Sequence, residues 1–578
     1  MFGRLIKGRN LTTTVLALLL ALAGSAQARV YIVTDTNDST RITSLRGAVI
    51  DATSPGRKDR FNLILLGGRE PYRKNTNGLT FFLTIPGADE TNSRTGDLDI
   101  IESRVTIMPI RGMATINASG LGDRVFRVFP RAQLTLQNLT ITGGKAPSGY
   151  EVETRGESAG AIFNSGYLFM WNCRILGNSA GTLITIFRSA DAGGIYNNGH
   201  CVLSRCIIAN NTAGSSSVPN IIGNGLIGGD GGGIYNSGTM VLESCIVSNN
   251  SSGNGSAGGY ASGDGDHGAI AIGSGGTGGD GGGIYNSGNL KISFCTINGN
   301  FSGSGGYGEV GGAGSGGKGG GIFNIGSLTL NTCTISSNYC GAGGMGYGAG
   351  PASWNAGAGG NGGSGGAIYN DGSLASISCT VVSNSAGPGA VGGNSDLAYS
   401  TTIPPVGGNG GDGGGIYNTT RGSAVLQNTL VAMNAANKGG SGGTILGITA
   451  TYQFFQTNGP PGTNGIGPDL AGAFTSQGFN LIGAGDGSAG FTNGVNADQV
   501  GSSAAPIDPR LGPLQMNGGP TPTHALLPGS PAIDQGKSFG VHADQRGHRR
   551  PQNFPSIPNA PGGDGSDIGA FELDIPLP

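Results

Sequence analysis

Residues 230–250 read DGGGIYNSGTMVLESCIVSNN, and this segment returns with variations through the middle of the chain. Each copy has an Asn after Ile-Tyr or Ile-Phe and a second Asn that closes it, here Asn236 and Asn250. The two Asn residues stand 14 positions apart in every copy except the last, whereas the spacing between copies varies widely. A rigid unit joined by spacers of variable length is typical of a solenoid whose coils stack and whose loops leave from one corner. The first Asn residues are Asn164, Asn197, Asn236, Asn286, Asn324, Asn370 and Asn418.

The pattern within one copy predicts strands rather than helices. In residues 318–338 the apolar residues Ile322, Leu328, Leu330, Cys333 and Ile335 mostly alternate with small or polar ones, and Asn-Gly and Asn-Thr corners interrupt them. Alternation at period two indicates β-strands, and frequent Gly and β-branched residues disfavour helix. We therefore predict an all-β fold, a right-handed parallel β-helix over most of residues 60–480, with a short N-terminal capping helix and long Gly-rich loops.

Stacked coils place equivalent residues in columns, because neighbouring parallel strands lie about 4.8 Å apart. Alternation predicts an inward Ile column, an outward aromatic column beside it, and Asn columns at the corners whose amides bond from coil to coil. The Ile column is Ile162, Ile195, Ile234, Ile284, Ile322, Ile368 and Ile416, and the aromatic column is Phe163, Tyr196, Tyr235, Tyr285, Phe323, Tyr369 and Tyr417. An aspartate in the Ile column should be severely destabilising.

Six cysteines form a further column: Cys173, Cys206, Cys245, Cys295, Cys333 and Cys379. Buried free thiols and a disulfide framework are both open interpretations. Parallel Cβ vectors in neighbouring coils favour free thiols, since a relaxed disulfide needs a shorter Cβ separation, about 3.8 Å.

Composition excludes some functions and predicts the loops. Gly numbers 117, charged residues make up 11 % of the chain, and the formal net charge is −2. Without a basic stripe, nucleic acid is not expected as a partner. Gly-rich inserts at 214–229, 253–279, 303–317, 341–363 and 387–411 hold few apolar residues. They predict protruding, mobile loops, and removal of 253–279 should be tolerated.

The chain divides into four predicted parts. Residues 1–28 have a basic start, an apolar run and an Ala-Gln-Ala cleavage site, which is the pattern of a secretory signal peptide. Residues 29–120 form an N-terminal cap and first irregular coils, with a helix near 44–52 that begins at Ser44. Residues 121–436 hold the repeat β-helix, and residues 437–578 hold C-terminal coils and a cap. No transmembrane segment is expected after signal removal.

Three motifs carry a family resemblance. SLRGAVIDA (44–52) resembles the Ser-Leu-Arg segment that opens many secreted bacterial right-handed β-helix proteins, with Gly47 where Glu is usual. The repeats, with GGAI at 365–368, resemble polymorphic outer-membrane-protein repeats. QGFNLIG (477–483), DPRLGPLQMNGGPTPTHALLPGSPAIDQG (508–536) and DIGAFE (567–572) resemble the end of the choice-of-anchor Q β-helix family. The resemblance implies a bacterial protein that is secreted or located at the cell surface.

The position six residues before each first Asn is the candidate metal site. It holds Ser158, Asp191, Asp230, Asp280, Lys318, Ser364 and Asp412. Either each Asp caps a turn, or a Ca²⁺ ion bridges the consecutive carboxylates of Asp191, Asp230 and Asp280. Turn capping is the favoured reading.

Two function hypotheses follow. The first is an exported non-enzymatic β-helix that presents loops or a sheet face for adhesion or for contact with glycans or cell-surface components. The second is a polysaccharide lyase or glycoside hydrolase on the same scaffold. No catalytic residues can be assigned, no cofactor other than Ca²⁺ is suggested, and few basic residues in the coils disfavour a lyase for acidic sugars. Whether the protein is an enzyme is left open, and the non-enzymatic reading is preferred.

Overall fold

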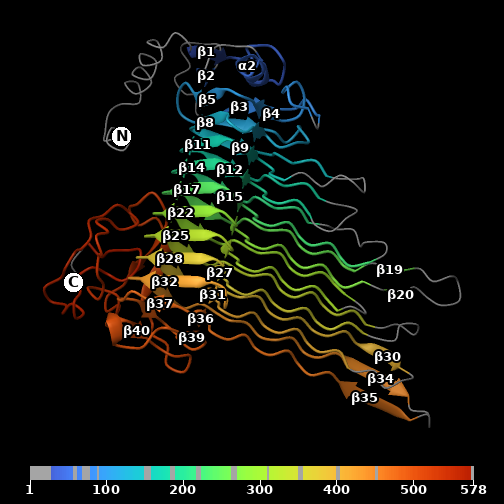
Figure 1. Cartoon of the computed structure of the whole chain (residues 1–578), viewed down its shortest axis with the longest axis vertical. Coiled ribbons are helices and arrows are strands. Elements are labelled where there is room, and N and C mark those ends of the chain that lie inside the picture. Colours follow the sequence, from blue (N-terminus) through green and yellow to red (C-terminus); the bar gives the residue numbers. More distant parts are fainter. Residues whose placement is uncertain are drawn as a thin grey trace.

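The computed structural model describes residues 28–55, 61–67, 78–87, 90–148, 158–182, 189–215, 223–258, 260–261, 270–271, 273–308, 312–348, 356–398, 404–448 and 453–574. The predicted signal peptide lies almost entirely outside these residues. Figure 1 shows a tall column of strands with the helix at one end, long arms on one side and the C-terminal segment against another side. The division at residues 29–120, 121–436 and 437–578 stays a prediction.

The column is a right-handed parallel β-helix, as the sequence predicts. Within the described residues it has three parallel sheets of 12, 11 and 12 strands, and each coil adds one strand to each sheet. We name the 11-stranded sheet the aromatic sheet. Of the two 12-stranded sheets, the one that begins with residues Ala28–Val33 is the long sheet and the other is the third sheet. Coil β21 (Ile284–Asn286), β22 (Asn289–Ser293) and β23 (Thr296–Asn298) is representative.

The strand bounds follow the repeats closely. The aromatic sheet is β4 (Leu98–Ile100), β7 (Phe126–Val128), β10 (Ile162–Asn164), β13 (Ile195–Asn197), β16 (Ile234–Asn236), β21, β24 (Ile322–Asn324), β27 (Ile368–Asn370), β31 (Ile416–Asn418), β36 (Leu470–Ala473) and β39 (Ser488–Ala489). The long sheet is β1 (Ala28–Val33), β2 (Phe61–Leu66), β5 (Arg104–Pro109), β8 (Gln133–Gln137), β11 (Tyr167–Trp171), β14 (His200–Ser204), β17 (Thr239–Glu243), β22, β25 (Ser327–Asn331), β28 (Ser373–Ile377), β32 (Ser423–Gln427) and β37 (Thr475–Ser476). The third sheet is β3 (Leu79–Phe82), β6 (Ala114–Asn117), β9 (Leu139–Thr142), β12 (Arg174–Leu176), β15 (Ile207–Ala209), β18 (Ile246–Ser248), β23, β26 (Thr334–Ser336), β29 (Thr380–Val382), β33 (Leu430–Ala432), β38 (Leu481–Ile482) and β40 (Gln499–Val500).

The predicted columns are confirmed. All seven residues of the Ile column are fully buried, and they stack in register, for example Ile234 on Ile284 on Ile322. Both Asn columns form side-chain ladders, in which each amide donates to the amide oxygen one coil on; Asn236 donates to Asn286 at 2.8 Å. All eight cysteines are buried free thiols. The ladders satisfy polar groups that the corners would otherwise bury unpaired.

The N-terminal helix covers the first coil, as predicted. Helix α2 (Leu45–Ala52) begins at Ser44, whose hydroxyl accepts from the Gly47 backbone N–H. Arg46 is completely buried and pairs with Asp38 at 2.7 Å. Its guanidinium also donates to two carbonyl oxygens of the loop before β4. A Cβ on Gly47 would lie 1.9 Å from the carbonyl oxygen of Arg41, which explains why this chain has Gly at that position.

The Gly-rich inserts do not behave as independent loops. We name residues 252–258, 302–308, 340–346, 386–392 and 436–443 the outgoing arms, and residues 223–230, 273–280, 312–318, 356–364, 404–412 and 459–466 the returning arms. Arms of the same kind lie side by side from coil to coil (Figure 1) and are hydrogen-bonded, as in Gly255 N–H to the Ser304 carbonyl at 2.9 Å. The outgoing and returning layers are also bonded to each other: Gly303 N–H donates to Gly279 at 3.0 Å.

The bonds between the layers recur every third residue, at Gly303 and Gly306 in one arm and at Gly341 and Gly344 in the next. This is the repeat of the polyproline II conformation, which leaves backbone groups free to bond with neighbouring chains. Glycine is needed for close approach, because a Cβ on Gly303 would lie 1.8 Å from the carbonyl oxygen of Gly253. The expected mobility of these segments is therefore wrong for the described arms, because backbone bonds replace apolar packing. Removal of 253–279 would break bonds to both neighbouring coils.

The last returning arm ends the array. Along the returning layer the donors to the next arm include Gly225, Gly275, Ala313, Gly359 and Gly407, and the last of these bonds to the carbonyl of Pro460 at 3.0 Å. The next residue in this column is Pro461, which has no backbone N–H. The outermost arm therefore offers no donor at this position to a further arm, which protects an open edge.

We expect Gly303→Ala to loosen the array. The added methyl group would press on the Gly253 carbonyl, and overpacking of this kind costs about 1–3 kcal/mol. Hydrogen exchange should accelerate at Gly279, Gly303 and Gly341. Ser304→Ala is the matched control, since Ala342 already fills the equivalent outer position of the next arm. Equal exchange in both variants would contradict the close packing of Gly303 against Gly253 of the neighbouring outgoing arm.

Five strands at the arm tips and a C-terminal segment complete the description. At the arm tips are β19 (Tyr260–Ala261) with β20 (Ile270–Ala271), and β30 (Ser395–Ala398) with β34 (Thr444–Ile448) and β35 (Phe454–Asn458). After η1 (Val495–Ala497), residues 508–574 include β41 (Leu511–Gln515) and β42 (Thr523–Leu526) and fold back along the third sheet. The Gln545 amide contacts the hydroxyls of Thr296 and Thr334 at 2.9 and 2.6 Å, so this segment clamps the middle coils from the side.

Candidate functional site

A groove of about 610 Å³ lies where the aromatic sheet meets the returning arms. Its lining comes from five returning arms and three coils of the aromatic sheet, so the groove follows the helix axis from coil to coil. The residues that line it are Ile227, Asp230, Thr277, Gly278, Asp280, Tyr285, Ser315, Gly316, Lys318, Asn361, Gly362, Ser364, Tyr369, Asn409, Gly410, Asp412 and Tyr417. We call it the axial groove.

One wall of the axial groove is the aromatic column. Its rings stack face to face in one continuous ladder from Phe163 to Tyr417, with centroids 4.6–5.3 Å apart and interplanar angles of 3–22°. Because each ring face covers the next ring, the ladder presents ring edges and hydroxyls rather than open faces. It therefore offers hydrogen bonding along the groove, and stacking of a ligand on an open ring face is restricted to the ends of the ladder.

The opposite wall carries amides and hydroxyls in fixed orientations. The Asn361 side-chain oxygen accepts from the Asn409 backbone N–H at 2.7 Å, and the Asn409 oxygen accepts from the Thr463 N–H at 2.9 Å. Both side chains are exposed, and neither amide nitrogen has a hydrogen-bond partner among the described residues, so each can donate to a ligand. Thr277 and Ser315 occupy the same position in earlier arms. The wall therefore has a polar group at this position in four successive arms, whereas the first arm has Ile227 there.

The predicted metal-site residues lie at the base of this wall. Asp191, Asp230 and Asp280 are in successive coils, and Asp230 and Asp280 line the axial groove while Asp191 does not. Each carboxylate accepts the backbone N–H of the next coil: Asp191 from Asp230 at 2.9 Å, Asp230 from Asp280 at 2.7 Å, and Asp280 from Lys318 at 2.7 Å. The side chains therefore cap the turns. Among the described residues, no group of three or more His, Cys, Asp or Glu is arranged to hold a metal ion, and the Ca²⁺ site stays a prediction.

Charges in the groove act on the phenol groups. Burial, followed by Asp371 and Asp280, raises the pKa of Tyr369 above its usual value. Burial, followed by Asp412 and Tyr369, raises the pKa of Tyr417. The ammonium of Lys318 lies 4.9 Å from the ring centroid of Tyr369. Both hydroxyls therefore keep their protons at neutral pH and serve as hydrogen-bond donors.

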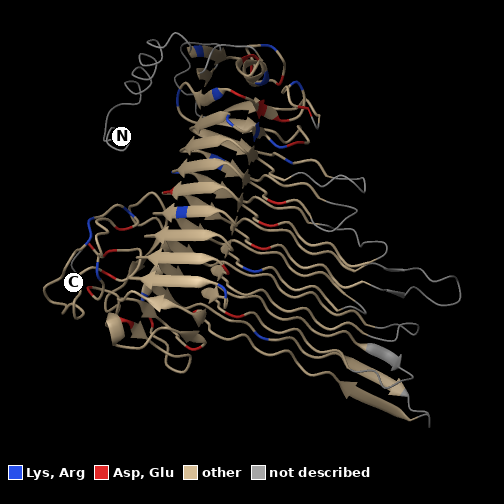
Figure 2. Cartoon of the chain, in the orientation of Figure 1, with Lys and Arg blue, Asp and Glu red and all other residues tan. Residues whose placement is uncertain are grey.

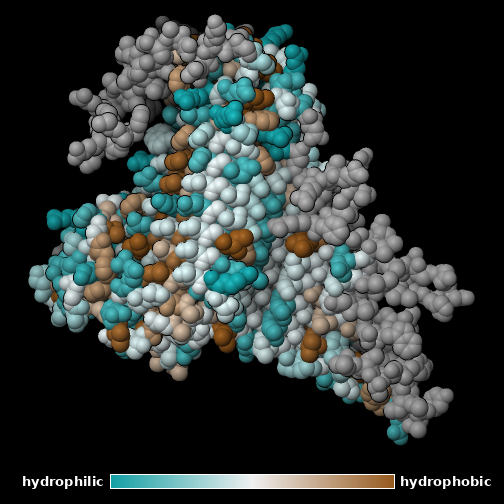
Figure 3. Space-filling model, viewed as in Figure 1, coloured by the Kyte–Doolittle hydropathy of each residue, from teal (hydrophilic) through white to brown (hydrophobic). Residues whose placement is uncertain are grey.

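The surface around the groove is weakly charged. Figure 2 shows charged residues gathered near the N-terminal end and in the C-terminal segment, with a row of them where the arms leave the coils. On the face seen in Figure 3, hydrophilic and neutral residues predominate and hydrophobic ones are scattered. Exposed apolar side chains occur in both layers of arms, among them Tyr307 and Met345 in the outgoing layer and Ile227 and Val406 in the returning layer.

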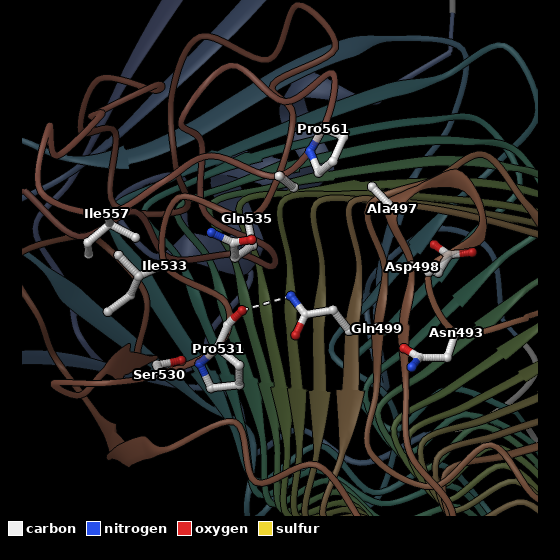
Figure 4. Close-up of a pocket in the computed structure, with 12 residues that line it drawn as sticks. Asn493, Ala497, Asp498, Gln499, Ser530, Pro531, Ile533, Gln535, Ile557 and Pro561 are labelled. Atoms are coloured by element: carbon white, nitrogen blue, oxygen red, sulfur yellow. Dashed lines mark hydrogen bonds between the residues drawn. The ribbon is translucent and has the colours of Figure 1, made fainter.

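A second cavity, of about 500 Å³, lies between the last coils and the C-terminal segment (Figure 4). Gln499 bridges its two sides by donating to the Pro531 carbonyl at 2.8 Å. Asp498 is its one charged residue, and both carboxylate oxygens accept protein hydrogen bonds, from Asn480 and from Ser476. This cavity therefore offers no unengaged acid or base among the residues that line it.

Arginine and acidic residues of the C-terminal segment form buried ion pairs within the segment. Arg546 bonds Asp544 at 2.8 Å and stacks on Phe571, while Arg550 bonds Glu572 at 2.8 Å. His524 contacts the Ser336 hydroxyl at 3.0 Å, and burial lowers its pKa. The two arginine pairs therefore hold the segment together, and His524 attaches it to the coils.

An acidic cluster at the N-terminal end of the aromatic ladder was not predicted. Arg124 pairs with Asp97 at 3.2 Å, approaches Asp123, and lies over the Phe163 ring. Asp99 is fully buried, and neither of its carboxylate oxygens has a hydrogen-bond partner within the described residues. Burial and the charge of Glu90 raise the pKa of Asp99 to about 7. The sequence has no spacing motif that predicts this cluster, because its residues come together only when the coils stack.

Asp99 predicts a pH dependence of stability. Its pKa is about 7 in the folded chain against about 3.9 in an unfolded one, so the folded state holds the proton more tightly. The protonated Asp99 side chain makes its full contribution to the free energy of unfolding below about pH 4. This contribution is lost as the pH rises toward 7. Each unit of pKa difference corresponds to about 1.4 kcal/mol. The N-terminal coils should melt at a higher temperature at pH 5 than at pH 8, and Asp99→Asn should flatten this difference. An unchanged pH profile in Asp99→Asn would contradict the assignment.

Comparisons with known proteins give solved structures that are similar at low scores only. No protein-family model matches the sequence, and no curated protein matches it. Among solved structures, pectate lyase Pel9A is similar, with 12 % identity, a TM-score of 0.35, and coverage of 96 % of this chain and 98 % of that one. The Dettilon tailspike protein gp208 has 12 % identity and a TM-score of 0.25 over 82 % and 68 % of the chains. ORF18 of Geobacillus virus E2 has 10 % identity and a TM-score of 0.23 over 77 % and 65 %. Among the described residues no helix is long and apolar enough to cross a membrane. The chain is a parallel β-helix protein, as its own three stacked sheets establish.

Proposed function

We propose that this protein is an exported, non-enzymatic β-helix protein of the bacterial surface or exterior that binds an extended glycan chain along the axial groove. The observation that carries the proposal is the recurrence of polar groups on both walls of the groove. The hydroxyls of three tyrosines lie on one wall and the side chains of Thr277, Ser315, Asn361 and Asn409 lie on the other. A chain of hydroxyl-rich units needs a matching series of donors and acceptors, and a preformed groove supplies them without the entropic cost of ordering a flexible site.

The resemblance to the choice-of-anchor Q family and to polymorphic outer-membrane-protein repeats belongs to the same proposal, as does secretion directed by residues 1–28. The segments that carry the resemblance include QGFNLIG (477–483) and DIGAFE (567–572). A surface location would present the groove and the arm layers to polysaccharides or other cell-surface components.

The placement of the carboxylates in the axial groove favours glycan binding over glycan cleavage. Glycoside hydrolysis requires one carboxylic acid and one carboxylate placed across the scissile bond. The carboxylates of Asp230, Asp280 and Asp412 all lie on one wall, and each accepts a backbone N–H of the following coil. Their geometry supports a structural role and ligand contact rather than proton transfer.

A glycan microarray with the full mature chain tests the proposal, followed by calorimetry on the strongest ligand. Asn409→Ala should weaken binding, since it removes a donor from the groove wall. Asn254→Ala is the matched control, because Asn254 caps the next arm in the same way, at 2.8 Å, but on the outgoing face. Equal binding by both variants would refute the groove as the site. Reducing-end and unsaturated-product assays on the same ligand would reveal cleavage, and product formation would support the enzymatic alternative.

A further inference from the structure

We infer that the axial groove selects glycan chains that carry protonated amines and disfavours chains that carry carboxylates or sulfates. This inference rests on the proposed function and adds the substrate class. The groove is lined by three carboxylates, from Asp230, Asp280 and Asp412, and one ammonium, from Lys318, which leaves a formal charge of −2. The chain as a whole is nearly neutral, so the groove is more acidic than its surroundings.

The carboxylates are held in place by the fold. One oxygen of Asp412 accepts from the Ile466 N–H at 2.8 Å, and one oxygen of Asp280 accepts from the Lys318 N–H at 2.7 Å. Each of these hydrogen bonds fixes the orientation of its carboxylate. The second oxygen of Asp412 has no partner among the described residues. A pre-oriented carboxylate can bind an ammonium group without first losing rotamer freedom.

The charges have a defined order along the axis. Asp230 and Asp280 are in adjacent coils, Lys318 is in the next coil, and Asp412 is two coils further. Asp280 and Asp412 are thus three coils apart, or about 14 Å at the spacing of parallel strands. Lys318 sits over Tyr369 between them, which divides the acidic lining into two regions. A polymer that runs along the groove can place amines at both ends of it.

The same arrangement acts against anionic chains. Like charges repel at close range, and the repulsion is stronger in a partly desolvated groove than in open water. A uronate chain would bring a carboxylate close to Asp280 or Asp412 in every register, and Lys318 alone could compensate only one of them. The neutral donors Asn361, Asn409 and the tyrosine hydroxyls suit uncharged hydroxyls, so neutral chains should bind with intermediate strength.

Calorimetric titration of the full mature chain with three short oligosaccharides tests the inference. The probes are a glucosamine oligomer, its N-acetylated counterpart and an oligogalacturonate. We expect the affinity to fall in that order at a mildly acidic pH, and the advantage of the amine to shrink at about 0.15 M salt or when the amine is deprotonated.

Charge-neutralising variants that keep the local hydrogen bonds show whether the charges of the groove determine the affinity. Asp412→Asn retains an oxygen to accept the Ile466 N–H and should weaken binding of the glucosamine oligomer by roughly fivefold, with little effect on the N-acetylated one. Lys318→Gln should strengthen it by a similar factor. Asp508→Asn, an exposed carboxylate outside the groove that accepts the Arg510 N–H, is the control and should leave both affinities unchanged.

The outcomes separate the two proposals. Equal affinity for the charged and neutral oligomers, with Asp412→Asn silent, would overturn the charge selection and leave glycan binding intact. Binding of no oligosaccharide would overturn the proposed function itself. Binding of polylysine as tightly as the glucosamine oligomer would show that charge alone suffices, and would refute a glycan as the preferred class.

Discussion

Ile284→Asp is expected to unfold the middle of the β-helix. Ile284 is fully buried between Ile234 and Ile322, and an aspartate there would place a carboxylate among apolar side chains with no counter-charge in the column. A buried, unpaired charge costs several kcal/mol, so we expect a loss of about 4 kcal/mol or more. Chemical denaturation followed by tryptophan fluorescence and circular dichroism would measure it. Because solenoid coils depend on their neighbours, the transition should also broaden or split.

Asn289→Asp is the matched control for this change. It adds the same charge to the same coil at an exposed position on the long sheet. A surface charge of this kind should change stability by less than about 0.5 kcal/mol. Similar losses in the two variants would mean that the Ile column is not the core of the coil.

Arg46→Met is expected to detach the N-terminal cap. The guanidinium and the carboxylate of Asp38 are both inaccessible to solvent, and Asp38 also accepts the backbone N–H groups of Thr84 and Ile85. Removal of one member of a buried pair leaves the other charge uncompensated, at a cost of about 3–5 kcal/mol. Hydrogen exchange should show early opening of α2, β1 and β2, with the middle coils retained.

A double substitution tests whether the cost comes from charge. Asn at position 38 keeps an oxygen for the two backbone donors, so Asp38→Asn combined with Arg46→Met should lose less stability than Arg46→Met alone. Arg41→Met, an exposed residue of the same segment, should have little effect. A double variant as unstable as the sum of the single changes would show that the arginine acts through packing rather than through its ion pair.

The coils could be predicted because their information is local and repeated. The fixed interval from Asn236 to Asn250 defines one coil, and period-two alternation assigns Ile234 to the interior and Tyr235 to the exterior. Once stacking is assumed, the columns follow without further knowledge. The capping helix was predictable for the same reason, since Ser44 and the apolar spacing after it are local signals.

The arms and the charged clusters could not be predicted by those arguments. A hydrophobicity argument finds nothing to pack in a Gly-rich insert, whereas these arms pack through their own backbone. A small residue at every third position, such as Gly303 and Gly306, is the signal that identifies the interlayer positions. Contacts between Asp97 and Asp123, or between Thr296 and Gln545, join residues that only the completed coils bring together.

The three-residue period of the arms restricts how this chain can change by insertion and deletion. Gain or loss of three residues in an arm shifts its end by one turn and leaves the interlayer glycines facing the opposite layer. Gain or loss of one or two residues would rotate side chains into the space where Gly253 and Gly303 approach each other. Natural variants of this chain should therefore differ in arm length by multiples of three, and neighbouring arms should lengthen together because each bonds to the next.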